Sequence, residues 1–151
     1  MFSEIPIIDI TPLVAGGNTA DVLAQLRAAY AKTGFGYVVG HGIDPLLIDA
    51  VFTASRRFHA LPQKMAVAVN ERHRGYIPIN TSTDVTSTLA EVTKPNQSAS
   101  FMVMREDVVM DPDVYLSGPN QWPDIPDFKS VLTTYTDQMS QLGFVLMQAM
   151  L

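Results

Sequence analysis

Three short runs of β-branched and aromatic residues, far apart in the sequence, constrain the fold of this chain most. They cover 5–9, 35–39 and 98–104, and their composition is typical of β-strands. No run is joined by a tight turn to a second one, and a strand without a neighbour leaves its backbone hydrogen-bonding groups unpaired. The sequence therefore predicts strands that complete a sheet supplied by residues outside this chain.

Apolar residues recur every three or four positions between and after these runs. The spacing predicts helices over about 19–32, 44–60 and 126–151. The second helix has a clear start, because Asp44 is a good N-cap and Pro45 suits the first helical position. Long helices with a few isolated strands indicate the α+β class.

Two long stretches lack steady periodicity and are predicted to be loops. The stretch 70–97 is rich in Thr, Ser, Asn and Arg, with one helical turn expected near Leu89. The stretch 111–126 is rich in Pro and Asp, and Trp122, the only tryptophan, is expected to anchor it. Long loops in compact domains are often functional or ordered by a neighbour.

The last ten residues, 142–151, are strongly apolar and carry no charge. They contain no Gly cap, basic last turn or polar tail, and an exposed helix end of this kind would form a large apolar patch. We expect the helix to continue past Leu151 in a longer protein. The alternative is a natural terminus that docks on the core.

Composition excludes several classes of function. The formal net charge of −5 argues against a nucleic-acid-binding surface. Zero cysteines exclude disulfides, thiolate metal sites and a cysteine nucleophile, and they fit a cytoplasmic protein. No window reaches the roughly 18 apolar residues of a membrane helix, so no membrane partner is expected.

No catalytic or metal-binding motif is present in the sequence. A mononuclear non-haem iron site uses two His and one carboxylate, usually with a local His-x-Asp pair. His41 is followed by Asp44, one residue too far along, and neither His59 nor His73 has such a neighbour. The motifs His-Glu-x-x-His and Gly-x-Ser-x-Gly are also absent. We therefore assign no catalytic residue and no metal ligand.

One basic segment remains as a candidate binding element. Arg72, His73 and Arg74 precede Gly75 and Tyr76 in a predicted loop. Two arginines at this spacing could clamp a carboxylate. The alternative is a surface loop with ordinary arginines.

Six short segments, taken in order and spacing, resemble a known family. They are Ile5-Pro-Ile-Ile-Asp9, Gly34-Phe-Gly36-Tyr37 with Val38-Val-Gly-His41-Gly42-Ile43, Phe58 with Leu61-Pro62-Gln-Lys64, Arg74-Gly75-Tyr76, Ser100-Phe101-Met102 and Gly118-Pro-Asn120-Gln-Trp122-Pro123. The set resembles the N-terminal region of the isopenicillin N synthase-like family. Its members are non-haem iron oxygenases, most of which depend on 2-oxoglutarate.

The resemblance implies a helical N-terminal region whose isolated strands complete a double-stranded β-helix, or jelly-roll barrel. The barrel itself is absent from this chain. Residues 1–124 would form the N-terminal region, and 125–151 a long amphipathic helix that leads into the missing C-terminal barrel. The family's iron ligands and its 2-oxoglutarate-binding pair lie in that barrel. Fe(II) and 2-oxoglutarate are thus implied for the complete enzyme, and neither is bound by this chain's own residues.

The resemblance also suggests substrate-binding residues, because two of its segments tend to face the active-site mouth in relatives. We expect Arg74, Tyr76, His73, Phe101 and Met102 to line a small-molecule pocket. The chain would then be the N-terminal part of an oxygenase and inactive alone.

Two other interpretations stay open. The chain could be a non-catalytic interaction module that pairs through its apolar C-terminal helix, or one half of an enzyme whose barrel is encoded separately.

Overall fold

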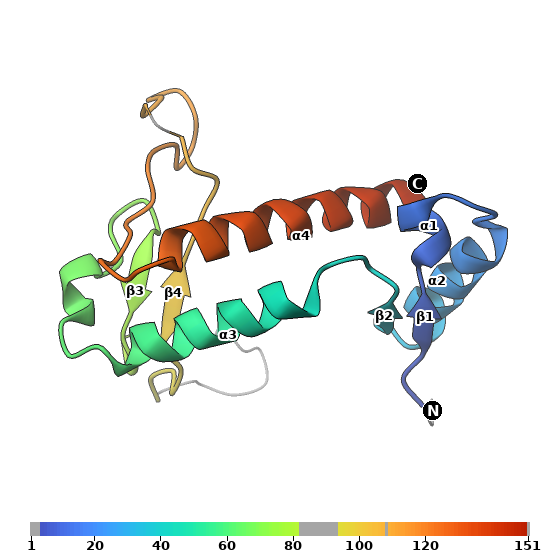
Figure 1. Cartoon of the computed structure of the whole chain (residues 1–151), viewed down its shortest axis with the longest axis horizontal. Helices are drawn as coiled ribbons and strands as arrows, with labels where there is room; N and C mark the ends of the chain where they lie inside the picture. The colour runs from blue at the N-terminus through green and yellow to red at the C-terminus, as the bar shows by residue number, and fades with distance from the viewer. Residues whose placement is uncertain (1–3, 82–93, 108, 151) are drawn as a thin grey trace. The chain divides into compact units, whose positions relative to one another are not determined.

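The computed structural model describes residues 4–81, 94–107 and 109–150, and it divides the chain into two compact units (Figure 1). Unit 1 comprises residues 1–52 and 130–151, and unit 2 comprises residues 53–129. In chain order the elements are β1 (Ile7–Asp9), α1 (Thr11–Ala15), α2 (Ala20–Lys32), β2 (Tyr37–Val39), α3 (Pro45–Ala60), the 3-10 helix η1 (Lys64–Val67), β3 (Gly75–Ile77), β4 (Ser100–Met102) and α4 (Phe128–Met150). The chain is α+β, and its described strands form no closed barrel.

The three long helices are confirmed to within two residues of their predicted ends. Asp44 caps α3 as expected, since its Oδ1 accepts a hydrogen bond from the Leu46 amide at 2.8 Å. The short helix α1, which contains Pro12, was not predicted from the sequence. Proline is well tolerated in the first turn of a helix, and Gly16 then ends α1 with φ of +84°.

Unit 1 is built around a two-stranded parallel sheet. Strands β1 and β2 pair in register, with Ile7 opposite Tyr37 and Asp9 opposite Val39. The prediction that these strands need partners from outside the chain is therefore wrong for this pair, because α1 and α2 form a crossover that brings them together.

One face of this sheet carries the core of unit 1. Ile8 and Ile10 are almost fully buried against α2. The core residues of α2 are spaced for one helix face, and part-buried residues of α4 complete the cluster. They are Val22, Leu26 and Ala29 on α2, and Leu142, Leu146 and Ala149 on α4. On both helices these residues recur at the three- or four-residue spacing from which the helices were predicted.

Unit 2 contains an antiparallel pair, in which Tyr76 of β3 lies opposite Phe101 of β4. The strand at 98–104 is confirmed as β4, but β3 lies in the stretch that was predicted to be a loop. Its signal is weak because only three residues are extended and the first is Gly75, with φ of +113°. The helical turn expected near Leu89 lies outside the described residues.

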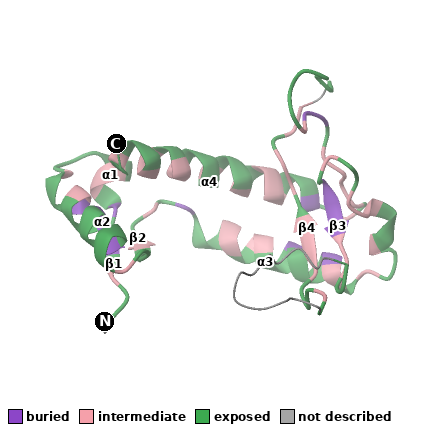
Figure 2. Ribbon diagram, turned by 180° about the vertical axis from the view of Figure 1, so that it is seen from behind, coloured by how far each residue is buried: buried purple, intermediate pink, exposed green. Residues whose placement is uncertain are grey.

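The core of unit 2 is aromatic. Phe58 is fully buried, and its ring centroid lies 4.7 Å from that of Phe101 and 5.6 Å from those of Tyr76 and Phe128. Trp122 packs against Phe128 at 6.4 Å, so it anchors its loop as predicted. Figure 2 shows buried positions around β3, β4 and the adjoining end of α3. In the part of the chain that the structure describes, no helix combines the length and apolarity needed to traverse a bilayer.

Candidate functional site

The five residues predicted to bind substrate lie on β3, on the turn before it and on β4. Gly75 pairs with Met102 and Tyr76 with Phe101, so the register brings Tyr76, Phe101 and Met102 onto neighbouring positions. His73 and Arg74 precede β3 directly. The structure thus collects all five around one short sheet. Their contact with a substrate stays a prediction.

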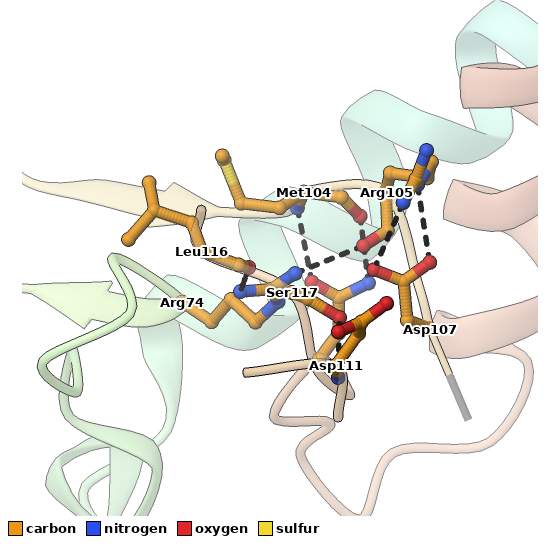
Figure 3. Close-up of polar contacts among 8 residues, drawn as sticks. Arg74, Met104, Arg105, Asp107, Asp111, Leu116 and Ser117 are labelled. Atoms are coloured by element: carbon orange, nitrogen blue, oxygen red, sulfur yellow. Dashed lines mark hydrogen bonds and ion pairs between the residues drawn. The ribbon is translucent and has the colours of Figure 1, made fainter. Parts of the chain in front are cut away.

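Arg74 is the most deeply buried charged residue described, with 1% of its surface exposed. Its Nη1 donates to the Leu116 carbonyl at 2.6 Å and to the Arg72 carbonyl at 3.2 Å. Its Nη2 donates to the Arg105 carbonyl at 2.9 Å (Figure 3). Of the buried side-chain polar atoms in the described residues, only Nε of Arg74 lacks a partner. The guanidinium therefore binds the main-chain carbonyls of Arg72, Arg105 and Leu116, and it forms no ion pair with the described residues.

The Arg72 guanidinium also binds a main-chain carbonyl. Its Nη1 donates to the Ser117 carbonyl at 2.9 Å. The two arginines thus bind successive carbonyls, at Leu116 and Ser117. Leu116 has φ of +58°, a left-handed conformation that costs energy in a residue with a side chain. The short, charge-assisted hydrogen bond from Arg74 stabilises that conformation.

The turn before β3 depends on two amides that the sequence analysis did not single out. Asn70 Oδ1 accepts hydrogen bonds from the backbone amides of Arg72 and Arg74 at 3.0 and 3.1 Å. Gln121 Nε2 donates to the carbonyls of Ala68 and Arg74, both at 2.7 Å. Asn is a common turn former, whereas Gln121 belongs to segment 118–123 of the family resemblance and was assigned no role, because its two acceptors lie about fifty residues earlier.

The aromatic residues of the site differ in exposure. Tyr76 is 5% exposed, and its ring lies 6.0 Å from that of His59. Lys64 Nζ lies 5.9 Å from the Tyr76 centroid, within cation–π range. Phe101 is half-buried, and Met102 is 36% exposed. Of the two β4 residues, Met102 is thus the more accessible to a ligand.

Two acidic residues beside the site have partners of opposite charge. Glu106 Oε1 accepts hydrogen bonds from Trp122 Nε1 at 3.0 Å and from Lys129 Nζ at 3.2 Å. Partial burial opposes ionisation, but these hydrogen bonds and the Lys129 charge outweigh it and lower the pKa of Glu106. Asp107 pairs with Arg105 at 3.1 Å, and the same arginine lowers the pKa of Asp107 through its side-chain hydrogen bonds.

The residues that the structure describes do not fit an iron ion. In the described ranges, no three His, Asp or Glu side chains gather as a metal site would require. The one His and Asp that lie close in sequence serve the backbone: His41 Nδ1 accepts a hydrogen bond from the Ile43 amide, and Asp44 caps α3. No reaction step through a metal can be derived from these residues.

Comparison with known proteins gives consistent matches over nearly the whole chain. The family model "non-haem dioxygenase in morphine synthesis N-terminal" matches residues 5–125. Clavatol oxidase claD of Penicillium crustosum is 30% identical over 166 aligned residues, which cover 95% of this chain and 48% of the relative. The 2-oxoglutarate-dependent dioxygenase citB of Monascus ruber is also 30% identical, with 95% and 46% covered.

A solved structure gives the same match in three dimensions. A full-length Neurospora crassa protein, crystallised in complex with alpha-KG and thymine, superposes with a TM-score of 0.76 at 26% identity, over 97% of this chain and 47% of that protein. The chain therefore spans about half the length of the relatives that it matches.

Proposed function

Because this chain belongs to the family of non-haem dioxygenase N-terminal regions, we propose that it forms the N-terminal half of an iron(II)- and 2-oxoglutarate-dependent oxygenase that oxidises a small organic substrate. The observation that carries this proposal is the match over residues 5–125, together with relatives about twice as long that are named as such enzymes. The described residues offer no ligand set for iron. In the proposal, a C-terminal jelly-roll barrel supplies the iron ligands and binds 2-oxoglutarate.

This chain's own part is to help shape the substrate pocket. We assign the wall of that pocket to β3, β4 and the turn at His73 and Arg74. The three hydrogen bonds made by Arg74 and the two made by Gln121 would hold this wall rigid, which is what substrate positioning requires. Residues 1–124 would act as the N-terminal region and 125–151 as the helix that connects it to the barrel. A cytoplasmic location fits the absence of cysteine from this chain.

The test compares the complete polypeptide from the natural source with the 151-residue chain. The intact mass is measured first, and then succinate release from 2-oxoglutarate with Fe(II) and a panel of small aromatic and heteroaromatic compounds. We expect a mass about twice 16.6 kDa and turnover by the complete polypeptide only. A polypeptide of 16.6 kDa from the natural source, with no copurifying barrel protein, would overturn the proposal.

A second function is supported by exposed apolar residues on α4. Phe144 and Met147 are 62% and 61% exposed and lie three residues apart, on one side of the helix. A non-catalytic module that pairs through this helix would associate with itself or with another chain. Sedimentation of the 151-residue chain separates the two functions, because a module should form a defined complex in the absence of any barrel.

A further inference from the structure

Unit 1 contains a cavity of about 410 Å³ between the loop 41–44 and the middle of α4. The residues that line it come from this loop, from α1 and from α4, and all of them belong to unit 1. None of the five residues assigned to the substrate pocket lines it. Sites for small molecules typically have volumes of about 300–1,000 Å³, so the cavity is large enough for a small organic ligand.

One side of α4 forms the long wall of this cavity. Asp137, Gln138 and Gln141 line its first part, and Leu142 and Val145 line its second part. Residues four apart lie above one another on a helix, and eight residues of helix extend over about 12 Å. The wall therefore changes from polar to apolar along its length, as the binding site of an amphipathic molecule would.

The polar groups of this wall are available to a ligand. Asp137 and Gln141 are exposed, and Gln138 is half-buried. Within the described ranges, none of these three side chains takes part in a hydrogen bond or an ion pair. A ligand that binds them would therefore displace only water.

The loop on the other side of the cavity is held in place by its own hydrogen bonds. His41 Nδ1 accepts one from the Ile43 amide at 3.1 Å, and Asp44 Oδ1 accepts one from the Leu46 amide at 2.8 Å. Ile43 is only 7% exposed and anchors the loop in unit 1. The loop thus adds a second carboxylate, that of Asp44, to the lining without having to be ordered by the ligand.

The charges of the lining select the class of ligand. Asp44 and Asp137 contribute two negative charges, and no Lys or Arg lines the cavity. The lining therefore attracts cations and repels anions. A metal ion is a poor fit, because no three His, Asp or Glu side chains gather among the described residues. It would also leave the apolar part of the wall unused.

We propose that this cavity binds a small organic cation, an amine with an apolar body. The ammonium group is bound beside Asp137, where Gln138 and Gln141 accept hydrogen bonds from it. The apolar body lies against Leu142 and Val145. This site requires no reaction, so it does not depend on the proposed oxygenase activity.

Three probes of similar shape and different charge test the proposal on the full-length polypeptide, at the length that its intact mass gives. They are 2-phenylethylamine as the cation, 2-phenylethanol as the neutral compound and 3-phenylpropanoate as the anion. Each Kd is measured by ligand-observed NMR at neutral pH and physiological salt. The titrations are repeated with Asp137→Asn and with Asp49→Asn. Asp49 is the matched control, because it is an exposed residue of unit 1 that does not line the cavity.

We expect 2-phenylethylamine to bind with a Kd on the order of 1 mM, as suits a probe of about ten non-hydrogen atoms. It should bind at least about fivefold more tightly than 2-phenylethanol, and 3-phenylpropanoate should bind most weakly. Asp137→Asn should raise the Kd of the amine by about fivefold and leave that of the alcohol unchanged, whereas Asp49→Asn should change neither by more than about twofold.

Three results would overturn the proposal. Equal affinities for the three probes would mean that the lining does not select a cation. Equal losses in Asp137→Asn and Asp49→Asn would assign the effect to net charge alone. Failure of the folded full-length polypeptide to bind the amine would mean that another part of the polypeptide fills the cavity. Succinate release is measured separately, so none of these results decides the proposed function.

Discussion

At the residue scale, Arg74 is the side chain on which the loop beside the candidate site depends most. Replacing it with Met removes the buried cation together with its three hydrogen bonds. The carbonyls of Leu116 and Arg105 then lack these donors. We expect Arg74→Met to lower the free energy of unfolding by about 2–4 kcal/mol, measured by urea denaturation.

Arg105→Met is the matched control. The Arg105 side chain is 77% exposed and forms its ion pair with Asp107, so its loss should change stability by less than about 0.5 kcal/mol. Equal effects of the two substitutions would contradict a structural role for the buried guanidinium. A small effect of Arg74→Met together with a large loss of substrate affinity in the complete polypeptide would favour direct contact with substrate.

Glu106 should make the environment of Trp122 depend on pH. Its pKa is lowered from the usual value of 4.5, so the ionised form is the one that the folded chain stabilises. This contribution is present above pH 4.5 and is lost as the pH falls through the lower pKa of the folded state. We expect the fluorescence of Trp122, the only tryptophan, to titrate below pH 4.5, and Glu106→Gln to abolish that transition. A titration that persists in Glu106→Gln would assign it to another carboxylate.

Sequence patterns predict only some of these residue roles. Trp122, the only tryptophan, was expected to anchor its loop, and its ring does pack on Phe101 and Phe128. Arg74 was singled out, but its burial could not be foreseen, because its acceptors include carbonyls 31 and 42 residues further along the chain. Main-chain acceptors carry no signature in the sequence.

At the scale of elements, two glycines give opposite predictions. A Cβ at Gly75, the first residue of β3, would lie 3.0 Å from the Ala68 carbonyl oxygen and closer still to that of Val67, at a φ of +113°. We expect Gly75→Ala to cost about 3 kcal/mol of unfolding free energy, from the clash and the backbone strain together.

Gly143 lies inside α4 and is the matched position, because a Cβ there meets nothing within 4 Å. Gly143→Ala should therefore raise the unfolding free energy by up to about 1 kcal/mol, since alanine has the higher helix propensity. Urea denaturation measures both variants. A loss of stability in Gly143→Ala would indicate that this side of α4 already contacts another part of the protein.

The elements themselves were more accessible to sequence reasoning than the residues. Helical periodicity and the Asp44-Pro45 start locate α3 without further information, because these signals are local. Strand pairing is a property of two distant segments, so β1 and β2 were recognised but their partnership was not. β3 was missed because three residues that begin with a glycine carry no strand pattern.

At the scale of the whole molecule, the two units differ in how completely they bury their apolar residues. Unit 2 closes around Phe58, Tyr76 and Phe128, all of them 5% exposed or less. Unit 1 leaves Ile7 and Tyr37 on its sheet, and Phe144 and Met147 on α4, each at least 60% exposed. The family resemblance predicted a missing barrel, but local patterns alone could not indicate which surfaces would be left open.

The roles of His41 and Asp44 predict that this chain binds Fe(II) weakly. His41 and Asp44 are committed to a turn and a helix cap, and the described residues bring no three ligands together. We therefore expect the affinity of the 151-residue chain for Fe(II) to be that of nonspecific surface binding. Anaerobic equilibrium dialysis measures this affinity. His41→Ala should leave the binding curve unchanged. Stoichiometric binding that is lost in His41→Ala would place a metal ligand in this half and would contradict the proposal that a C-terminal barrel alone supplies the iron ligands.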